Sequence, residues 1–190
     1  GAQNTAMGAS SLLSNSTGSA NTAVGWSSVR SNTTGSRNVG VGISSLQNNS
    51  TGFSNVAVGS YALFRNTEKY NLVAVGDSAL YNNGFGAGPN SPIEGIFPAM
   101  FNTAVGSKAL YGNTTGNSNS ALGRNALFAN TSGSANTANG TSALGSNTFG
   151  SFNTAVGVAA LGGNTTGSYN TAIGYQTGNA ATTQNNYTAL

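Results

Sequence analysis

The stretch Asn153–Tyr169 reads N-T-A-V-G-V-A-A-L-G-G-N-T-T-G-S-Y, and close variants of it fill most of the 190-residue chain. Short repeats of this kind cannot bury an apolar face alone and become stable when they stack as coils of a solenoid. We number the columns of the repeat 1 to 17 and expect one coil per repeat. Column 5 is glycine in ten copies at a constant spacing, except for one longer interval between the fifth and the sixth: Gly8, Gly25, Gly42, Gly59, Gly76, Gly106, Gly123, Gly140, Gly157 and Gly174.

Other columns keep the same register. Column 1 is Asn in nine of ten copies, column 3 is Ala or Gly in all ten, column 9 is Leu or Val in nine, and column 12 is Asn in nine. Charged residues form only 5% of the chain, against about 25% in a typical soluble domain. This composition alone would fit disorder. The fixed apolar columns argue against it, because disordered segments lack regularly placed apolar residues.

Columns 2 to 4 alternate in the manner of a strand, with columns 2 and 4 on one face and column 3 on the other. We expect columns 2, 4 and 9 to form the interior, and two strands and two corners in each coil. The glycine of column 5 fits a positive φ at one corner, and N-T-T-G fits the other, where its glycine can take the left-handed conformation. Coils stacked about 4.8 Å apart would align the Asn columns as amide ladders. The fold class predicted is an all-β parallel solenoid, of the β-roll or β-helix type, with one full set of 17 columns in each coil.

The small residues of column 3 are expected to lie opposite the core. A stripe of alanines along the whole array suggests a close approach of another chain, so we expect a homo-oligomer, first of all a trimer around a common axis. The alternative is that alanine only fits a crowded corner of a monomeric solenoid.

The longer interval holds an inserted segment, Ala87–Phe101, where other copies have only two positions, and it contains all three prolines of the chain. Proline resists a continuing β ladder, so this segment is expected to leave the shaft as a loop. The predicted organisation is therefore one continuous domain, which we expect to be a fragment of a longer array, with solenoid repeats over 1–86 and 102–190 and a loop over 87–101. Loops often carry function, and the candidate contact residues are Ile93, Ile96, Phe97, Met100 and Phe101. The alternative is that the loop packs on its own shaft or on a neighbouring protomer.

Column 10 carries aromatic residues in four successive copies, namely Phe64, Tyr81, Tyr111 and Phe128. Aromatic side chains on a surface can stack on sugar rings, or they can form oligomer contacts and shield the shaft. Both interpretations stay open at this point.

Most catalytic chemistry is missing from the composition. The chain has no His and no Cys, and its three acidic residues lie in different repeats, so we expect no enzymatic activity, no cofactor and no metal site. The net charge of +3 comes from scattered cations, which argues against nucleic acid as a partner. No apolar run reaches the roughly 18 residues needed to span a membrane.

The unit N-T-A-V-G-x-x-A-L-x-x-N-T-T-G-S resembles the head repeats of trimeric autotransporter adhesins, and is still more similar to repeat regions of phage tail fibres that end in a self-cleaving chaperone domain. The resemblance covers the chain except 87–101. It implies a left-handed parallel β-roll in a homotrimer that attaches to host or matrix surfaces. It also implies core positions at Val24, Val58, Val105 and Val156, and corner positions at Gly25, Gly59, Gly106 and Gly157.

The function expected from these patterns is a structural shaft or adhesive segment of an extracellular or virion fibre, located on a cell surface or a phage. Its partners would be copies of itself, stacked around an axis or end to end, and a host-surface glycan or protein. Two alternatives remain: a self-polymerising filament subunit, and an ice-binding solenoid whose Thr column matches an ice lattice.

Overall fold

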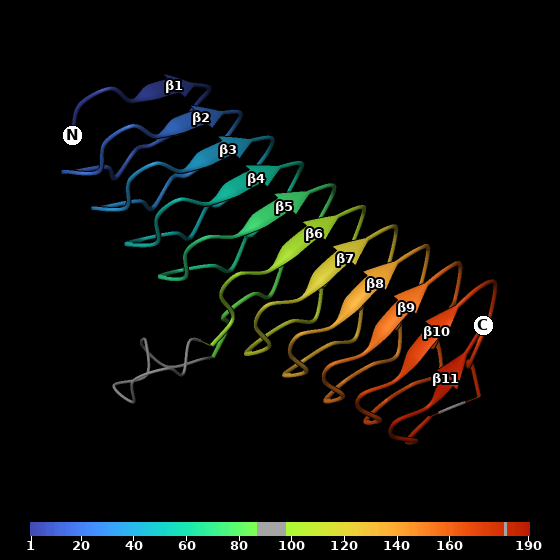
Figure 1. The fold of residues 1–190 in the computed structure, drawn as a ribbon. Coiled ribbons are helices and arrows are strands. Elements are labelled where there is room, and N and C mark those ends of the chain that lie inside the picture. The colour runs from blue at the N-terminus through green and yellow to red at the C-terminus, as the bar shows by residue number, and fades with distance from the viewer. Residues whose placement is uncertain (87–97, 181) are drawn as a thin grey trace.

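The computed structural model describes residues 1–86, 98–180 and 182–190, and over these ranges it contains eleven short strands and no α-helix. All eleven strands form one parallel sheet in chain order (Figure 1). The predicted all-β parallel solenoid with one coil per repeat is confirmed. The strands are β1 Thr5–Met7, β2 Thr22–Val24, β3 Val39–Val41, β4 Val56–Val58, β5 Val73–Val75, β6 Thr103–Val105, β7 Ser120–Leu122, β8 Thr137–Asn139, β9 Thr154–Val156, β10 Thr171–Ile173 and β11 Thr188–Ala189.

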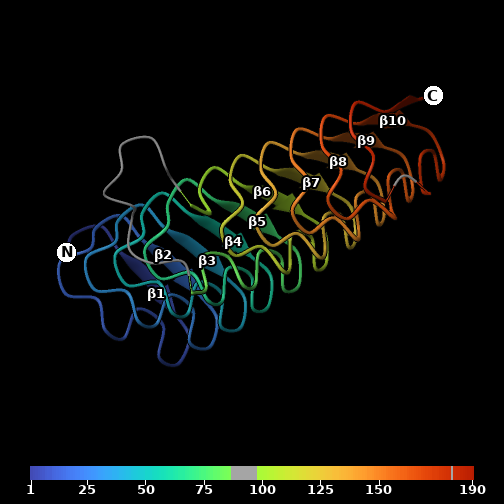
Figure 2. The ribbon, with the colours of Figure 1, turned by 90° about the horizontal axis from the view of Figure 1, so that it is seen from below.

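The coils lie on one another along an elongated body, with the two ends of the chain at opposite ends of the stack (Figure 2). Equivalent columns pair throughout: Ala57 lies beside Ala74, for example. The register also continues across the longer interval, where Val73 pairs with Thr103. No helix of the described residues is long and apolar enough to cross a membrane.

Backbone hydrogen bonds between coils extend well beyond the strands. The Val39 N–H donates to Asn55 O (2.8 Å), the Ser44 N–H donates back to Trp26 O (2.9 Å), and the Leu46 N–H donates forward to Ala62 O (2.9 Å). Each coil is thereby bonded to the coil before it and the coil after it. The prediction of two strands per coil is wrong, because each described coil has one strand and turns fill the remainder.

The interior is built from columns 3, 8 and 9. Apart from the end coils, the alanines of column 3 are buried, as are the alanines or serines of column 8 and the aliphatic residues of column 9, whereas columns 2 and 4 point outward. The assignment of columns 2 and 4, with Val24, Val58, Val105 and Val156, to the core is therefore wrong, and so is the outward alanine stripe. Because the coil is thin, the leucine side chain of column 9 fills most of the interior and leaves room only for the methyl group of an alanine in column 3.

One pair of coils shows how tight this fit is. Column 8 holds Ser28 and Ser45 instead of alanine, and column 3 holds Gly40 between them. A Cβ on Gly40 would lie 2.6 Å from both Ser28 Oγ and Val29 Cγ2. The Ser28 hydroxyl instead donates to Gly40 O at 2.9 Å. A larger residue in column 8 is thus matched by a smaller residue in column 3.

The two Asn columns form the predicted amide ladders. Asn32 Nδ2 donates to Asn15 Oδ1 in the preceding coil and to Gly35 O in its own coil, both at 2.8 Å. Asn21 Nδ2 donates to the same Gly35 O at 2.8 Å, while the Asn21 N–H donates to Asn4 Oδ1 at 2.9 Å. Both Asn columns therefore converge on the carbonyl of column 15, and they satisfy backbone groups that the corners bury.

The glycines of columns 5 and 15 are required for different reasons. Gly106 in column 5 has φ 136°, and a Cβ there would lie 2.6 Å from the carbonyl of Gly123 in the next coil. This confirms the predicted corner. The glycines of column 15 do not take the left-handed conformation, contrary to expectation; a Cβ on Gly35 would instead collide with Gly52 O and with Asn32 Oδ1.

The left-handed backbone recurs in three other columns, whose described residues are non-glycine except for Gly178 in column 9. Ser44 in column 7, Leu46 in column 9 and Ser54 in column 17 have φ of 55°, 49° and 54°, and the same columns repeat this in the other coils. Such a backbone is uncommon for non-glycine residues. In this solenoid it turns the chain at fixed places in every coil.

The coil register resumes at Ala99 after the longer interval. Asn83 Nδ2 donates to Ala99 O at 2.8 Å, in the same way as the other asparagines of column 12 donate to column 15. The Ser118 N–H donates to Met100 O, as column 17 does to column 16 elsewhere. Ala99, Met100 and Phe101 thus belong to the coil, although the repeat pattern placed them in the inserted loop.

Candidate functional site

The four aromatic residues of column 10 form one ladder of stacked rings, which we call the aromatic ladder: Phe64, Tyr81, Tyr111 and Phe128. Successive ring centroids are 5.2, 5.2 and 5.4 Å apart, with interplanar angles of 17°, 16° and 13°. The spacing follows from the solenoid, because strands of neighbouring coils lie about 4.8 Å apart. Rings inside the ladder cover each other's faces, so they leave only their edges for a ligand.

At the first end of the ladder, other side chains lie beside the rings. Tyr61 meets Phe64 edge-on with ring centroids 5.6 Å apart. The Arg65 guanidinium lies 5.7 Å from the ring centre of Tyr81 and 4.1 Å from that of Phe85. An open hollow of about 420 Å³ lies here, lined by Asn48, Phe64, Arg65, Thr67 and Phe85.

The other end of the ladder is open. Column 10 continues with Gly145 and Gly162 after Phe128, and a hollow of about 290 Å³ follows the last ring. We call it the end hollow; its lining includes Asn125, Phe128, Ser142, Gly145, Ser146 and Asn179. Sequence reasoning missed this feature. The available signal was the change from aromatic residues to glycine within one column.

A second aromatic group lies in columns 16 and 17. Phe53 and Tyr70 stack with centroids 4.5 Å apart, and Tyr70 meets Phe101 edge-on at 6.2 Å. Arg37 lies 6.0 Å from the ring centre of Phe53. Of the candidate contact residues, Phe101 is therefore exposed beside Tyr70, whereas Met100 is fully buried in its coil. The remaining candidates, Ile93, Ile96 and Phe97, lie outside the described residues.

Lys69 is an unusual residue of the central coils. It occupies column 15, where most copies have glycine, and its side chain is buried. A Cβ on Gly84 would lie 3.0 Å from Lys69 Cγ, so the lysine stem packs over that glycine. Burial lowers the pKa of the Lys69 ammonium group, and the nearby charge of Glu68 opposes this shift.

Columns 2 and 4 form the outward face of the sheet, which we call the sheet face. Column 4 is aliphatic in every strand from β1 to β10 except for Asn139 in β8. The exposed fractions of Val58, Leu122 and Ile173 are 36%, 49% and 46%. An apolar stripe therefore runs along the shaft on the side opposite the buried alanines.

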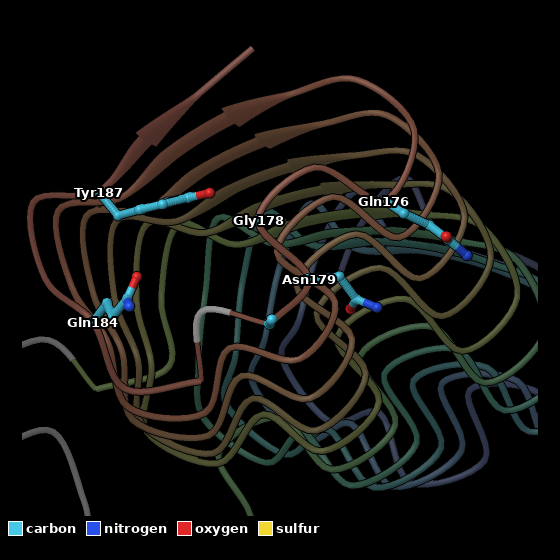
Figure 3. Close-up of a pocket in the computed structure, with 6 residues that line it drawn as sticks. Gln176, Gly178, Asn179, Gln184 and Tyr187 are labelled. Atoms are coloured by element: carbon cyan, nitrogen blue, oxygen red, sulfur yellow. The ribbon is translucent and has the colours of Figure 1, made fainter.

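A third hollow, of about 540 Å³, lies at the last coil (Figure 3). The Tyr187 side chain extends across the coil toward Gly178, which replaces the usual leucine of column 9. A Cβ on Gly178 would lie 2.9 Å from Leu161 Cδ2 and from Tyr187 Cε1. The Tyr187 ring therefore packs against the core at the place where other coils have the leucine of column 9. The lining residues that the structure describes are all uncharged.

Over the described ranges, no group of three or more His, Cys, Asp or Glu residues is placed so that it could hold a metal ion. The arrangement offers flat aromatic surfaces, amides and hydroxyls, which suit binding by contact. No protein-family model, curated protein or solved structure matches this chain.

Proposed function

We propose that this chain is a structural shaft or adhesive segment of an extracellular or virion fibre, and that it attaches to surfaces without catalysis. The continuous stack of coils supports this role. Each coil is hydrogen-bonded to both neighbours through its backbone and its Asn side chains, which makes an extended and stiff rod. A stiff rod can hold several copies of a weak binding surface at a distance from its anchor, which favours multivalent attachment.

The sheet face is the single observation that carries the assembly part of the proposal. Its column 4 carries apolar side chains in β1 to β10 except at Asn139, and those of Met7, Val58, Leu122 and Ile173 are exposed whereas the others are partly buried. Long apolar surfaces of this kind mark interaction sites in soluble proteins. In the proposed assembly, three copies pack their sheet faces around a common axis. The trimer and a left-handed coil follow the resemblance to adhesin and tail-fibre repeats.

The test is the oligomeric mass of the purified chain by sedimentation velocity, with a protomer of 18.8 kDa. We expect a trimer for the native sequence. The double variant Val58→Lys and Leu122→Lys places charge on the sheet face and should give monomers with unchanged circular dichroism. Phe149→Lys is the matched control, because that exposed ring lies in column 14, away from the sheet face. A native chain that stays monomeric at micromolar concentration would contradict the proposed assembly, and long filaments in electron micrographs would favour the end-to-end alternative.

Ice binding is a second candidate, because column 2 also points outward from the in-register sheet. Seven of its eleven residues are threonine: Thr5, Thr22, Thr103, Thr137, Thr154, Thr171 and Thr188. Val39, Val56, Val73 and Ser120 interrupt the hydroxyl row. Thermal hysteresis at micromolar protein would displace the fibre proposal, whereas its absence would leave the fibre proposal as the better account.

A further inference from the structure

Phe128 has one free aromatic face at the end of the aromatic ladder. Its other face stacks on Tyr111, with centroids 5.4 Å apart and an interplanar angle of 13°. Because the ladder runs from coil to coil, the free face of Phe128 points along the shaft toward the coil of Gly145. No side chain from Gly145 or Gly162 fills the place that a fifth ring would take, and the Phe128 residue is 38% exposed. The end hollow therefore has an aromatic wall at one side.

Polar side chains also line the end hollow, from the coil of Phe128 to that of Asn179. Asn125 and Ser142 come from column 7, Ser146 from column 11 and Asn179 from column 10. None of these four side chains makes a hydrogen bond with another residue of the described chain. Their amides and hydroxyls are consequently available to donate to and accept from a ligand. None of the described residues that line the hollow is charged.

A flat apolar wall beside uncharged hydrogen-bonding groups fits a particular ligand class. A pyranose ring has C–H groups on its face, which pack on an aromatic ring, and hydroxyls around its rim, which pair with amides and hydroxyls. The absence of cations in the lining argues against phosphate or carboxylate groups. An aromatic side chain from another protein would use Phe128 but would leave the four polar groups without partners. The volume of about 290 Å³ is at the lower end of known ligand sites.

We propose that the end hollow binds a neutral saccharide, with one pyranose ring stacked on Phe128 above Gly145. This inference gives a ligand class to the proposed attachment role and rests on that role for its biological setting. Saccharide binding by one chain is measured separately from assembly, so the two proposals can fail independently. A single shallow site predicts weak binding, in the millimolar range, which several copies on one rod would strengthen.

Gly145→Tyr is the most informative variant, because it should fill the hollow without disturbing the coil. The Gly145 N–H donates to Ser142 O at 3.0 Å, just as the Phe128 N–H donates to Asn125 O at 3.2 Å, so both residues lie in the same type of turn. A Cβ on Gly145 would lie 3.0 Å from Ser142 O, which requires a shift of a few tenths of an ångström. The new ring would then extend the aromatic ladder and take the place of the sugar.

The experiment is saturation-transfer NMR of methyl β-D-glucopyranoside with the full chain. We expect saturation concentrated on the axial protons of one ring face. Phe128→Ala should weaken binding at least tenfold, and Gly145→Tyr should abolish it while the melting temperature stays equal or rises. Phe152→Ala is the matched control, because that ring stacks on Tyr169 in another column, and binding should remain. Since no charge lines the hollow, added salt should not change the affinity.

Other outcomes would overturn the inference. No saturation transfer at tens of millimolar glycoside would do so, and so would undiminished binding by Gly145→Tyr, which would place the sugar elsewhere. Stronger competition by N-acetyl-tyrosine amide than by the sugar would assign the hollow to an aromatic peptide instead. A trisaccharide that binds more tightly than the methyl glycoside would indicate a polymeric surface glycan, and equal affinity would indicate recognition of a single free or terminal ring.

Discussion

The coils from Thr103 to Ser151 and those from Phe53 to Phe101 share one backbone register but are stabilised by different side chains. In the later coils, Asn, Ala, Leu and Gly recur in their columns and form uninterrupted ladders. In the central coils three columns depart from this pattern: Lys69 packs over Gly84 of the next coil, Leu72 is buried in an Asn column, and Ala99 stands in column 15. The comparison shows that the backbone register is the same in both regions. The side chains within a column can be replaced when residues in neighbouring coils change with them.

The largest loss of stability is expected from a change at the close backbone contact between coils in column 5. Gly106→Ala places a Cβ 2.6 Å from the Gly123 carbonyl, at a φ of 136°. Neither coil can move away without breaking the hydrogen bonds to its other neighbour, so we expect a loss of about 4 kcal/mol in the free energy of unfolding, measured with urea.

The control for that variant is Gly86→Ala. Gly86 also has a positive φ, 74°, but an added Cβ would meet no atom of the described residues within 4 Å. Its cost should be that of the backbone conformation alone, about 1 kcal/mol. Equal losses for the two variants would show that contact between coils is not what requires glycine in column 5.

The next effect concerns the Asn ladder of the regular coils. Asn130 Nδ2 donates to Asn113 Oδ1 and Gly133 O, both at 2.9 Å, and its own Oδ1 accepts from Asn147. Asn130→Ala would leave these buried groups without partners and should cost about 2 to 3 kcal/mol. Asn117→Ala is the control, because the Asn117 side chain makes no hydrogen bond with another described residue. Thermal unfolding of both variants would check this, and a small loss for Asn130→Ala would mean that the backbone alone fixes the coil.

The aromatic ladder of the central coils should contribute less. Tyr111 stacks on both Tyr81 and Phe128. Tyr111→Ala removes both contacts, and we expect a loss of about 1 to 2 kcal/mol by urea unfolding, because each aromatic pair adds about 0.5 to 1.5 kcal/mol. Phe149→Ala should be nearly neutral, since that ring is exposed. If Tyr111→Ala were equally neutral, the ladder would have no part in stability, and its rings would be free to serve a ligand.

The smallest effect is the pH dependence contributed by Lys69. Burial lowers its pKa below the ordinary value of 10.5, with Glu68 acting in the opposite direction. The unfolded chain therefore binds the Lys69 proton more tightly than the folded chain does. The buried ammonium charge lowers the free energy of unfolding by its full amount below the folded-state pKa, and this loss disappears as the pH rises toward 10.5. The melting temperature of the native chain should rise over this alkaline window relative to that of Lys69→Met. Parallel curves for the two proteins would contradict the assignment.

The sequence was sufficient to predict the coil, its register and the Asn ladders, because these follow from residues that repeat at a fixed spacing. It did not reveal which face of the strand points inward. The alternation of residues along a strand defines two faces without saying which one is buried. The β-branched valines suggested that their face forms the core. So short a coil, however, has room only for alanines such as Ala57 opposite the leucines. The uniform small size of column 3 was the available signal.

The backbone conformation of columns 7, 9 and 17 could not be predicted from their residue types. Leu46, Ser44 and Ser54 are not typical of the left-handed region, and their conformation is imposed by hydrogen bonds to adjacent coils. The ladder of column 10 follows from the coil spacing once the register is known. The end hollow requires in addition the side chains of columns 7 and 11, namely Asn125, Ser142 and Ser146, which line it together with Phe128.

The left-handed residues also have a consequence for how the chain folds. Each costs about 1 to 2 kcal/mol in an isolated peptide, so a single coil with three of them is unstable until a finished neighbour supplies hydrogen-bond partners. We therefore expect an existing coil to act as a template for the next, so that folding proceeds by elongation from a first folded coil. Such a mechanism makes the first coils the slow step and aligns every later repeat with the one already in place.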